Sequence, residues 1–118
     1  MAHFLLMAAY SPETLKAMVM DPTALAMREK HAEQFYGALG GKVKQQFFIR
    51  NGNFHFMVVV DFPNDATAHA AMIVGQASGA FQNCVAYSLA SYQEAQEAIN
   101  ISAKAAAVFF APGEQPKQ

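Results

Sequence analysis

The stretches HFLLMAA (residues 3–9) and FHFMVVVDF (residues 54–62) decide the fold, because each is apolar at nearly every position. Alternate side chains of a β-strand point to opposite faces of a sheet. Both stretches therefore present apolar side chains on both faces, which is typical of central strands that are covered on both sides. A chain of 118 residues supplies helices for one covering layer only. The second layer is expected to come from another copy, so the sequence predicts a homodimer.

The remaining segments place helices and two further strands around the two central strands. Capping and turn residues predict four helices: one after Ser11-Pro12, two over residues 22–39 and 66–78, and one from Ser91 to about Val108. Two further strands are predicted over residues 42–50 and 80–89. The order β-α-β-β-α-β with a terminal helix predicts an α+β, ferredoxin-like fold whose four-stranded antiparallel sheet has the order 4-1-3-2. We expect one domain over residues 1–110 and a disordered tail over 111–118.

Hydrophobic patterning also predicts which residues share a face in the outer elements. The predicted groups are Val43, Phe47 and Ile49 in the second strand, Ala70, Ile73, Val74 and Ala77 on the inner side of the second crossover helix, and Phe81, Asn83, Val85, Tyr87 and Leu89 pointing inward from the fourth strand.

Both crossover helices are expected on one face of the sheet, because such connections are right-handed. The other face then exposes six to eight large apolar side chains. At roughly 1.5 kcal/mol each, leaving them in water forfeits on the order of 10 kcal/mol, which rivals the stability of a whole domain. The sequence therefore predicts that two sheets pack face to face.

The composition excludes several classes of function. The chain is 53% hydrophobic and 14% charged, with a net charge of −1 and no cluster of Lys or Arg, so a nucleic-acid partner is not expected. No apolar window is long enough for a membrane span, and residues 1–7 do not resemble a signal peptide. The single Cys84 forms no internal disulfide, which favours a reducing, cytoplasmic location.

A few polar residues in apolar surroundings are candidates for a binding or catalytic role. His55 begins a central strand on the face expected to meet the partner, and it is the candidate base or hydrogen-bond donor, although a structural interface histidine is the simpler interpretation. Asn83, Tyr10, Tyr36 and Tyr87 are candidates for the lining of a pocket between helices and sheet. The four histidines show no metal-ligand spacing, so no metal or other cofactor is expected.

Three segments resemble the GYD domain family: residues 38–43 (ALGGKV), 52–55 (GNFH) and 58–65 (VVVDFPND). The resemblance spans about residues 4–99 and implies a small, mostly bacterial protein of the dimeric α+β barrel group. Phe54 and His55 stand where the family motif has Tyr and Asp, so a hydroxyl and a carboxylate are missing here. The resemblance implies no single reaction, because related barrels include mono-oxygenases, isomerases and ligand binders.

Our leading interpretation is a homodimer that binds a small, largely apolar molecule. Two alternatives remain open from the sequence. One is a cofactor-independent mono-oxygenase or isomerase in which His55, Asn83 or a tyrosine polarises the substrate. The other is a structural assembly subunit that forms higher oligomers through its last helix or its edge strands.

Overall fold

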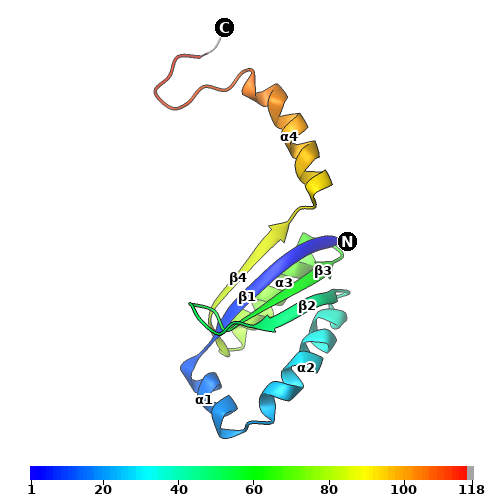
Figure 1. Ribbon diagram of the computed structural model, residues 1–118, viewed down its shortest axis with the longest axis vertical. Helices are drawn as coiled ribbons and strands as arrows, with labels where there is room; N and C mark the ends of the chain where they lie inside the picture. Colours follow the sequence, from blue (N-terminus) through cyan, green and yellow to red (C-terminus); the bar gives the residue numbers. More distant parts are fainter. Residues whose placement is uncertain (117–118) are drawn as a thin grey trace.

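The computed structural model describes residues 1–116 and confirms the predicted fold. Its elements are β1 (Ala2–Tyr10), α1 (Pro12–Met20), α2 (Ala24–Ala38), β2 (Lys42–Phe48), β3 (Phe56–Phe62), α3 (Asp65–Ala77), β4 (Phe81–Leu89) and α4 (Tyr92–Ala106) (Figure 1). The strands form one antiparallel sheet in the order β2-β3-β1-β4, with β3 and β1 in the centre. This is the ferredoxin-like α+β order expected from the sequence.

Local sequence signals explain where the helices begin and end. The side chains of Ser11, Asn64 and Ser91 each accept a hydrogen bond from a backbone N–H in the first turn of α1, α3 and α4, respectively. At the other end of α2, Gly40 adopts a φ of +76°, a conformation that glycine enters without steric cost. The chain reverses there and returns as β2.

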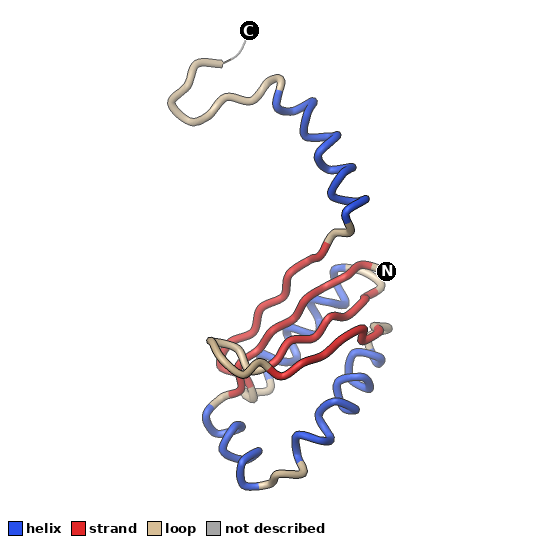
Figure 2. Tube along the Cα trace, viewed as in Figure 1, coloured by secondary structure: helices blue, strands red, loops and turns tan. Residues whose placement is uncertain are grey.

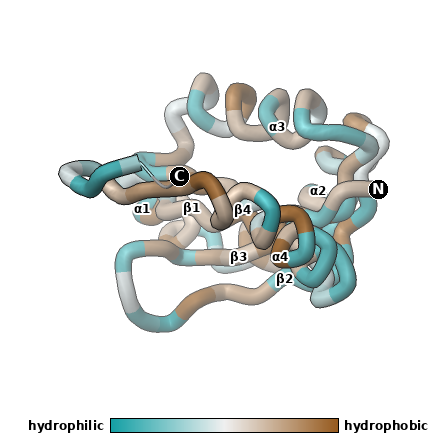
Figure 3. The backbone as a smooth tube through the Cα atoms, turned by 90° about the horizontal axis from the view of Figure 1, so that it is seen from above, coloured by the Kyte–Doolittle hydropathy of each residue, from teal (hydrophilic) through white to brown (hydrophobic). Residues whose placement is uncertain are grey.

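One face of the sheet carries the hydrophobic core. α2 packs against β2, and α3 packs against β4 and β3 (Figures 1 and 2). Figure 3 shows α3 as a separate layer beside the strands. Below these helices, Val58, Val60 and Phe62 of β3 are almost completely buried, and Phe4 and Leu6 of β1 pack against them. We call this side of the sheet the covered face.

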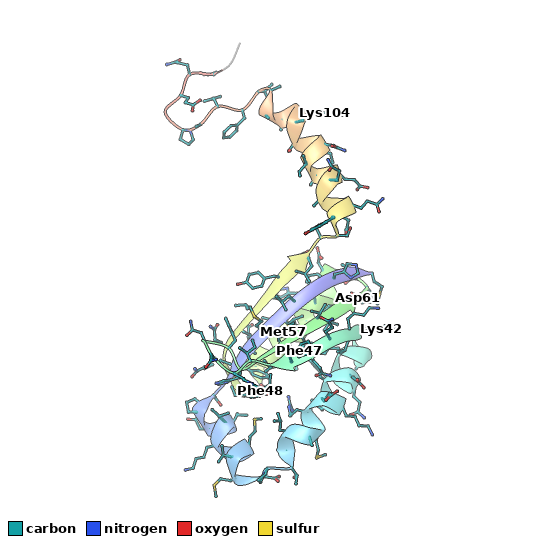
Figure 4. The ribbon with its side chains drawn as sticks, viewed as in Figure 1. Lys42, Phe47, Phe48, Met57, Asp61 and Lys104 are labelled. Atoms are coloured by element: carbon teal, nitrogen blue, oxygen red, sulfur yellow. The ribbon has the colours of Figure 1, made fainter. Side chains whose placement is uncertain are left out.

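The opposite side, which we call the open face, has no covering layer within residues 1–116. Leu5, Met7, Met57 and Val59 stand there by register in the two central strands and are only partly buried. The edge strands add Phe47, which is 62% exposed, and Tyr87, which is 50% exposed. Figure 4 shows Phe47 and Met57 side by side on neighbouring strands.

The last helix does not cover the open face. α4 leaves the end of β4 and projects away from the body, with no extensive packing on any other described helix or strand (Figure 1). Ile99 and Ile101 of α4 are more than 60% exposed, and so is Phe109 beyond it. Residues 111–116 contain neither helix nor strand; the last two residues of the predicted disordered tail, 117 and 118, lie outside the described part of the chain.

The predicted groupings in β2 and α3 are wrong. In β2 the register shifts between Val43 and Gln45, so Val43 pairs with Val60 on the covered face, whereas Phe47 pairs with Met57 on the open face. In α3 the small residues Ala68 and Ala71 meet the sheet, and Ile73 and Val74 are half exposed. Small side chains let a helix approach a sheet closely, which explains why alanines rather than larger residues face the core of this helix.

Candidate binding cavity

A cavity of about 470 Å³ lies between the covered face and the helices α2 and α3. It forms because α2 covers the β2 side of the sheet and α3 covers the β4 side, without extensive packing between the two helices. Small residues keep this space free: Ala8 on the sheet, Ala32 on α2, and Ala71 and Gly75 on α3 all line it. The cavity size falls in the range of small-molecule sites.

The walls of the cavity are mainly apolar and aromatic. At one end, Tyr10 packs against Phe56 and Phe81, with ring centroids 5.3 and 5.4 Å apart. Phe35 of α2 lines the other side. Some lining residues, such as Leu25, are exposed, so the cavity is open to solvent at this rim. A flat or compact apolar molecule would therefore replace water along most of its surface here.

Tyr36 supplies one of the two tyrosine hydroxyl groups among the residues that line this cavity; the other belongs to Tyr10. The Tyr36 ring, on α2, packs against Phe35 at 5.0 Å and against the edge of Phe62 at 5.9 Å, and the residue is only 8% exposed. Burial, together with the nearby Cys84, raises the pKa of the Tyr36 hydroxyl to about 12, and Arg28 acts in the opposite direction. The hydroxyl is therefore protonated at neutral pH and available as a hydrogen-bond donor.

Within residues 1–116, the Tyr36 hydroxyl has no hydrogen-bond partner. Every fully occluded side-chain polar atom in that part of the chain is hydrogen-bonded. An unbonded Tyr36 oxygen must therefore reach accessible space, and the space that Tyr36 lines is the cavity. This leaves a donor at the cavity wall that a ligand could use.

Cys84 lies on β4 opposite Ala8 and also lines the cavity. Burial raises the pKa of its thiol, so the neutral thiol predominates and the side chain is a poor nucleophile. Cys84 is therefore an unreactive, partly buried cysteine.

His55 has a different position from the predicted one. Its ring stacks against Tyr10 at 5.8 Å and Phe48 at 6.3 Å, and both of these aromatic residues stand on the covered face by register. The prediction placed His55 on the open face, but the residue precedes β3, which begins at Phe56, so strand alternation does not set its direction.

The hydrogen bond made by His55 indicates a structural role. Its Nδ1 accepts the backbone N–H of Tyr10 at 2.8 Å, and its own backbone N–H donates to Ala8. Nδ1 is therefore the unprotonated nitrogen, and its lone pair is already engaged. These two bonds hold the β2–β3 loop against the end of β1.

Asn83 and Tyr87 do not point into the cavity as predicted. Asn83 pairs with Ala9 and Tyr87 pairs with Leu5, which places both on the open face. The reason is a bulge: Tyr10 pairs with Phe81 while Ala9 pairs with Asn83, so Gln82 is an extra residue and the faces of β4 reverse there. Phe81 alone of the predicted inward group faces the cavity.

The structure thus brings two of the five candidate residues, Tyr10 and Tyr36, together around one cavity. Arg28 also lines the cavity, although it was not among the residues predicted from the sequence. Sequence reasoning also missed the role of the small residues on α2 and α3. A run of Ala and Gly on helices expected to pack on a sheet was the available signal for unfilled space.

A second polar cluster lies at the far end of the open face. Asp61 of β3 accepts a hydrogen bond from the His3 Nδ1, and the Lys44 Nζ lies 3.7 Å from the other Asp61 carboxylate oxygen (Figure 4). The hydrogen bond from His3 is the main cause that lowers the pKa of the Asp61 carboxyl, with a smaller contribution from Lys44. The carboxylate is therefore ionised and paired at neutral pH.

Neither the cavity lining nor the cluster of His3, Asp61 and Lys44 resembles a metal centre. Among residues 1–116, no three His, Cys, Asp or Glu side chains come together in a way that could hold a metal ion.

No helix in the described part of the chain is both long and apolar enough to cross a membrane.

A comparison with protein families identifies the family to which this chain belongs. Residues 4–99 match the family model of the GYD domain. The chain belongs to the GYD domain family. The match includes every element of the sheet, the helices that enclose the cavity, and the first half of α4. A search of curated proteins found no match for this GYD-domain protein.

Proposed function

We propose that this GYD-domain protein binds a small, largely apolar molecule in the cavity between the covered face and the helices α2 and α3. The observation that carries the proposal is a volume of about 470 Å³ with aromatic walls and an unbonded hydroxyl group. An apolar ligand would displace water from these apolar walls, which is favourable in proportion to the apolar area that it covers. The access at the rim gives such a molecule a way in.

Variants of α2 test the site. Ala32→Leu adds a larger side chain at the cavity wall, whereas Ala38→Leu makes the same change at an exposed position of the same helix. With 2-ethylnaphthalene as the probe in equilibrium dialysis, we expect Ala32→Leu to weaken binding at least tenfold and Ala38→Leu to leave it unchanged. Binding of this probe that survives Ala32→Leu unchanged would contradict the proposal.

We also propose that two copies associate through the open face. Apolar side chains occupy its centre, and the His3, Asp61 and Lys44 cluster lies at its end, as in interfaces with an apolar core and a polar rim. An isologous contact lets the same apolar patch cover itself in both copies. Sedimentation velocity at micromolar concentration is expected to show a dimer, and a stable monomer would remove this proposal.

The enzymatic alternative has less support than the binding function. A mono-oxygenase or isomerase needs a polar group beside the substrate, but His55 uses its Nδ1 for the backbone of Tyr10. Asn83 and Tyr87 stand on the other side of the sheet from the cavity. Tyr10 and Tyr36 are the remaining candidate groups for polarising a substrate.

One observation favours a second candidate function, an assembly subunit. The apolar residues of α4 are exposed, and the helix extends away from the body (Figure 1). The double variant Ile99→Gln/Ile101→Gln makes this helix polar in the full chain. If α4 builds higher oligomers, sedimentation will show species larger than a dimer in the wild type and lose them in the variant. A wild type that never exceeds a dimer would contradict this function.

A further inference from the structure

We propose that the cavity selects an uncharged molecule with one carbonyl-type oxygen, which accepts a hydrogen bond from the Tyr36 hydroxyl. This inference rests on the proposed binding function and adds the chemical class of the ligand. It follows from three features of the wall: the unpartnered hydroxyl of the buried Tyr36, the uncharged side chains of Cys84 and Tyr10 beside it, and formal charges of opposite sign on α2.

The donor is the first feature. The Tyr36 side chain is fixed by its contacts with Phe35 and Phe62, and its hydroxyl has no partner among residues 1–116. A ligand that fills the cavity displaces water from this hydroxyl, and leaving the donor without a partner is then costly, whereas an acceptor oxygen on the ligand avoids that cost. A hydrocarbon of the same shape would fill the cavity and leave the donor unsatisfied.

The neighbours of Tyr36 are the second feature. Cys84, Arg28 and Tyr10 interact electrostatically with it and line the same cavity. Cys84 and Tyr10 are neutral, and the Arg28 charge is opposed by that of the adjacent Glu29. The raised pKa of the Cys84 thiol keeps this group neutral, as burial does for Tyr36. A charged group buried against neutral side chains is strongly disfavoured. The inner wall thus suits a neutral oxygen better than a carboxylate.

The third feature is the distribution of charge near the opening. Arg28 and Glu29, adjacent on α2, both line the cavity, and neither forms an ion pair within residues 1–116. Their formal charges cancel. His31, also at the wall, stacks on Phe35 with ring centroids 6.4 Å apart. Gln46 of β2 donates its Nε2 hydrogen to the Glu29 backbone oxygen at 3.2 Å. This lining has no net positive charge to attract an anion.

Three matched probes test the inference by equilibrium dialysis. 2-Acetylnaphthalene carries a carbonyl oxygen, 2-ethylnaphthalene has nearly the same shape without an acceptor, and 2-naphthoate carries a negative charge. We expect the ketone to bind about 2–12-fold more tightly than the hydrocarbon, which is the range for one net hydrogen bond, and the carboxylate to bind most weakly.

The Tyr36→Phe variant identifies the donor, because it removes the hydroxyl and keeps the ring. It should abolish the preference for the ketone and leave the affinity for 2-ethylnaphthalene nearly unchanged. A preference that survives in Tyr36→Phe would overturn the inference, as would equal binding of ketone and hydrocarbon by the wild type.

The remaining outcomes separate this inference from the proposed function. If 2-naphthoate binds most tightly and loses its affinity in Arg28→Gln, the cavity selects an anion and the inference is wrong, while binding in the cavity stands. If none of the three probes binds, the binding function itself fails together with the inference.

Discussion

The two faces of the sheet both have apolar residues at their centre but are covered in different ways. On β1, Phe4 and Leu6 are 7% and 5% exposed, whereas Leu5 and Met7, between and beside them in sequence, are only partly buried. The first pair meets α2, α3 and the core, and the second pair faces outward from the open face. Apolar sequence therefore specifies that a surface must be buried, but it does not specify by what.

The same contrast extends to the two capped helices. α3 and α4 both begin with a complete capping box, at Asn64 and Ser91 respectively. α3 packs on the sheet, and α4 has no extensive contact with the rest of the described chain. Local signals start both helices equally well, and tertiary packing distinguishes them.

The largest effect should come from removing a core aromatic on the covered face. Phe62→Ala is expected to lower the free energy of unfolding by about 3–5 kcal/mol, because Phe62 is fully buried and its loss leaves a cavity. Phe47→Ala, on the open face, is the matched control and should cost under about 1 kcal/mol in a dilute, monomeric sample. Urea denaturation measures both, and equal losses would mean that the two faces are covered alike.

A charge in the middle of the open face should act on association rather than on folding. Val59→Asp buries an unpaired charge if two open faces meet, which costs roughly 3–5 kcal/mol and weakens the dimer about 100-fold or more. The exposed α3 residue Ala66 gives the control Ala66→Asp. Sedimentation should detect a monomer for the first variant only, with an unchanged circular dichroism spectrum. A Val59→Asp dimer of wild-type affinity would show that this face is not the interface.

The two helix caps sharpen the comparison of α3 with α4. Asn64→Ala should lower the free energy of unfolding by about 1 kcal/mol, because α3 unfolds together with the sheet. Ser91→Ala removes an equivalent hydrogen bond but should change the global urea midpoint little, because α4 is not part of the core. A comparable loss in Ser91→Ala would instead indicate that α4 packs on another copy.

The smallest effect concerns pH at the edge of the open face. Hydrogen bonding from His3 lowers the pKa of the Asp61 carboxyl from its ordinary value of 3.8, so the folded state binds this proton less readily than the unfolded chain. The stabilisation is therefore present above pH 3.8 and is lost as the pH falls through the lowered pKa. Asp61→Asn should be less stable than wild type by about 1 kcal/mol or less at pH 6–7.

The Asp61→Asn comparison has a built-in control in its pH dependence. Urea midpoints of the variant and the wild type should converge below pH 3.8 as the wild-type carboxyl takes up its proton. A difference that stays constant from pH 7 to pH 3 would show that the carboxylate charge does not contribute to stability.

Local sequence patterns predicted most of the fold correctly. They predicted fewer of the residues at the candidate site. Tyr36 and Tyr10 were predicted near a cavity between helices and sheet, and the structure places both at its wall. Asn83 and Tyr87 were placed on the wrong side, because one extra residue in β4 reverses which face each following side chain takes. Such a bulge has no signature in hydrophobic alternation.

The sequence by itself determined the element order, the central position of the two apolar strands, and the capping residues of α1, α3 and α4, because strand alternation and capping depend on neighbours along the chain. Only the tertiary structure decided that α2 and α3 stand apart over the sheet and leave a cavity at Tyr36. It also decided that α4 turns away from the open face. These features depend on how closely helices and strands approach one another, which is set by packing between residues that are distant in sequence.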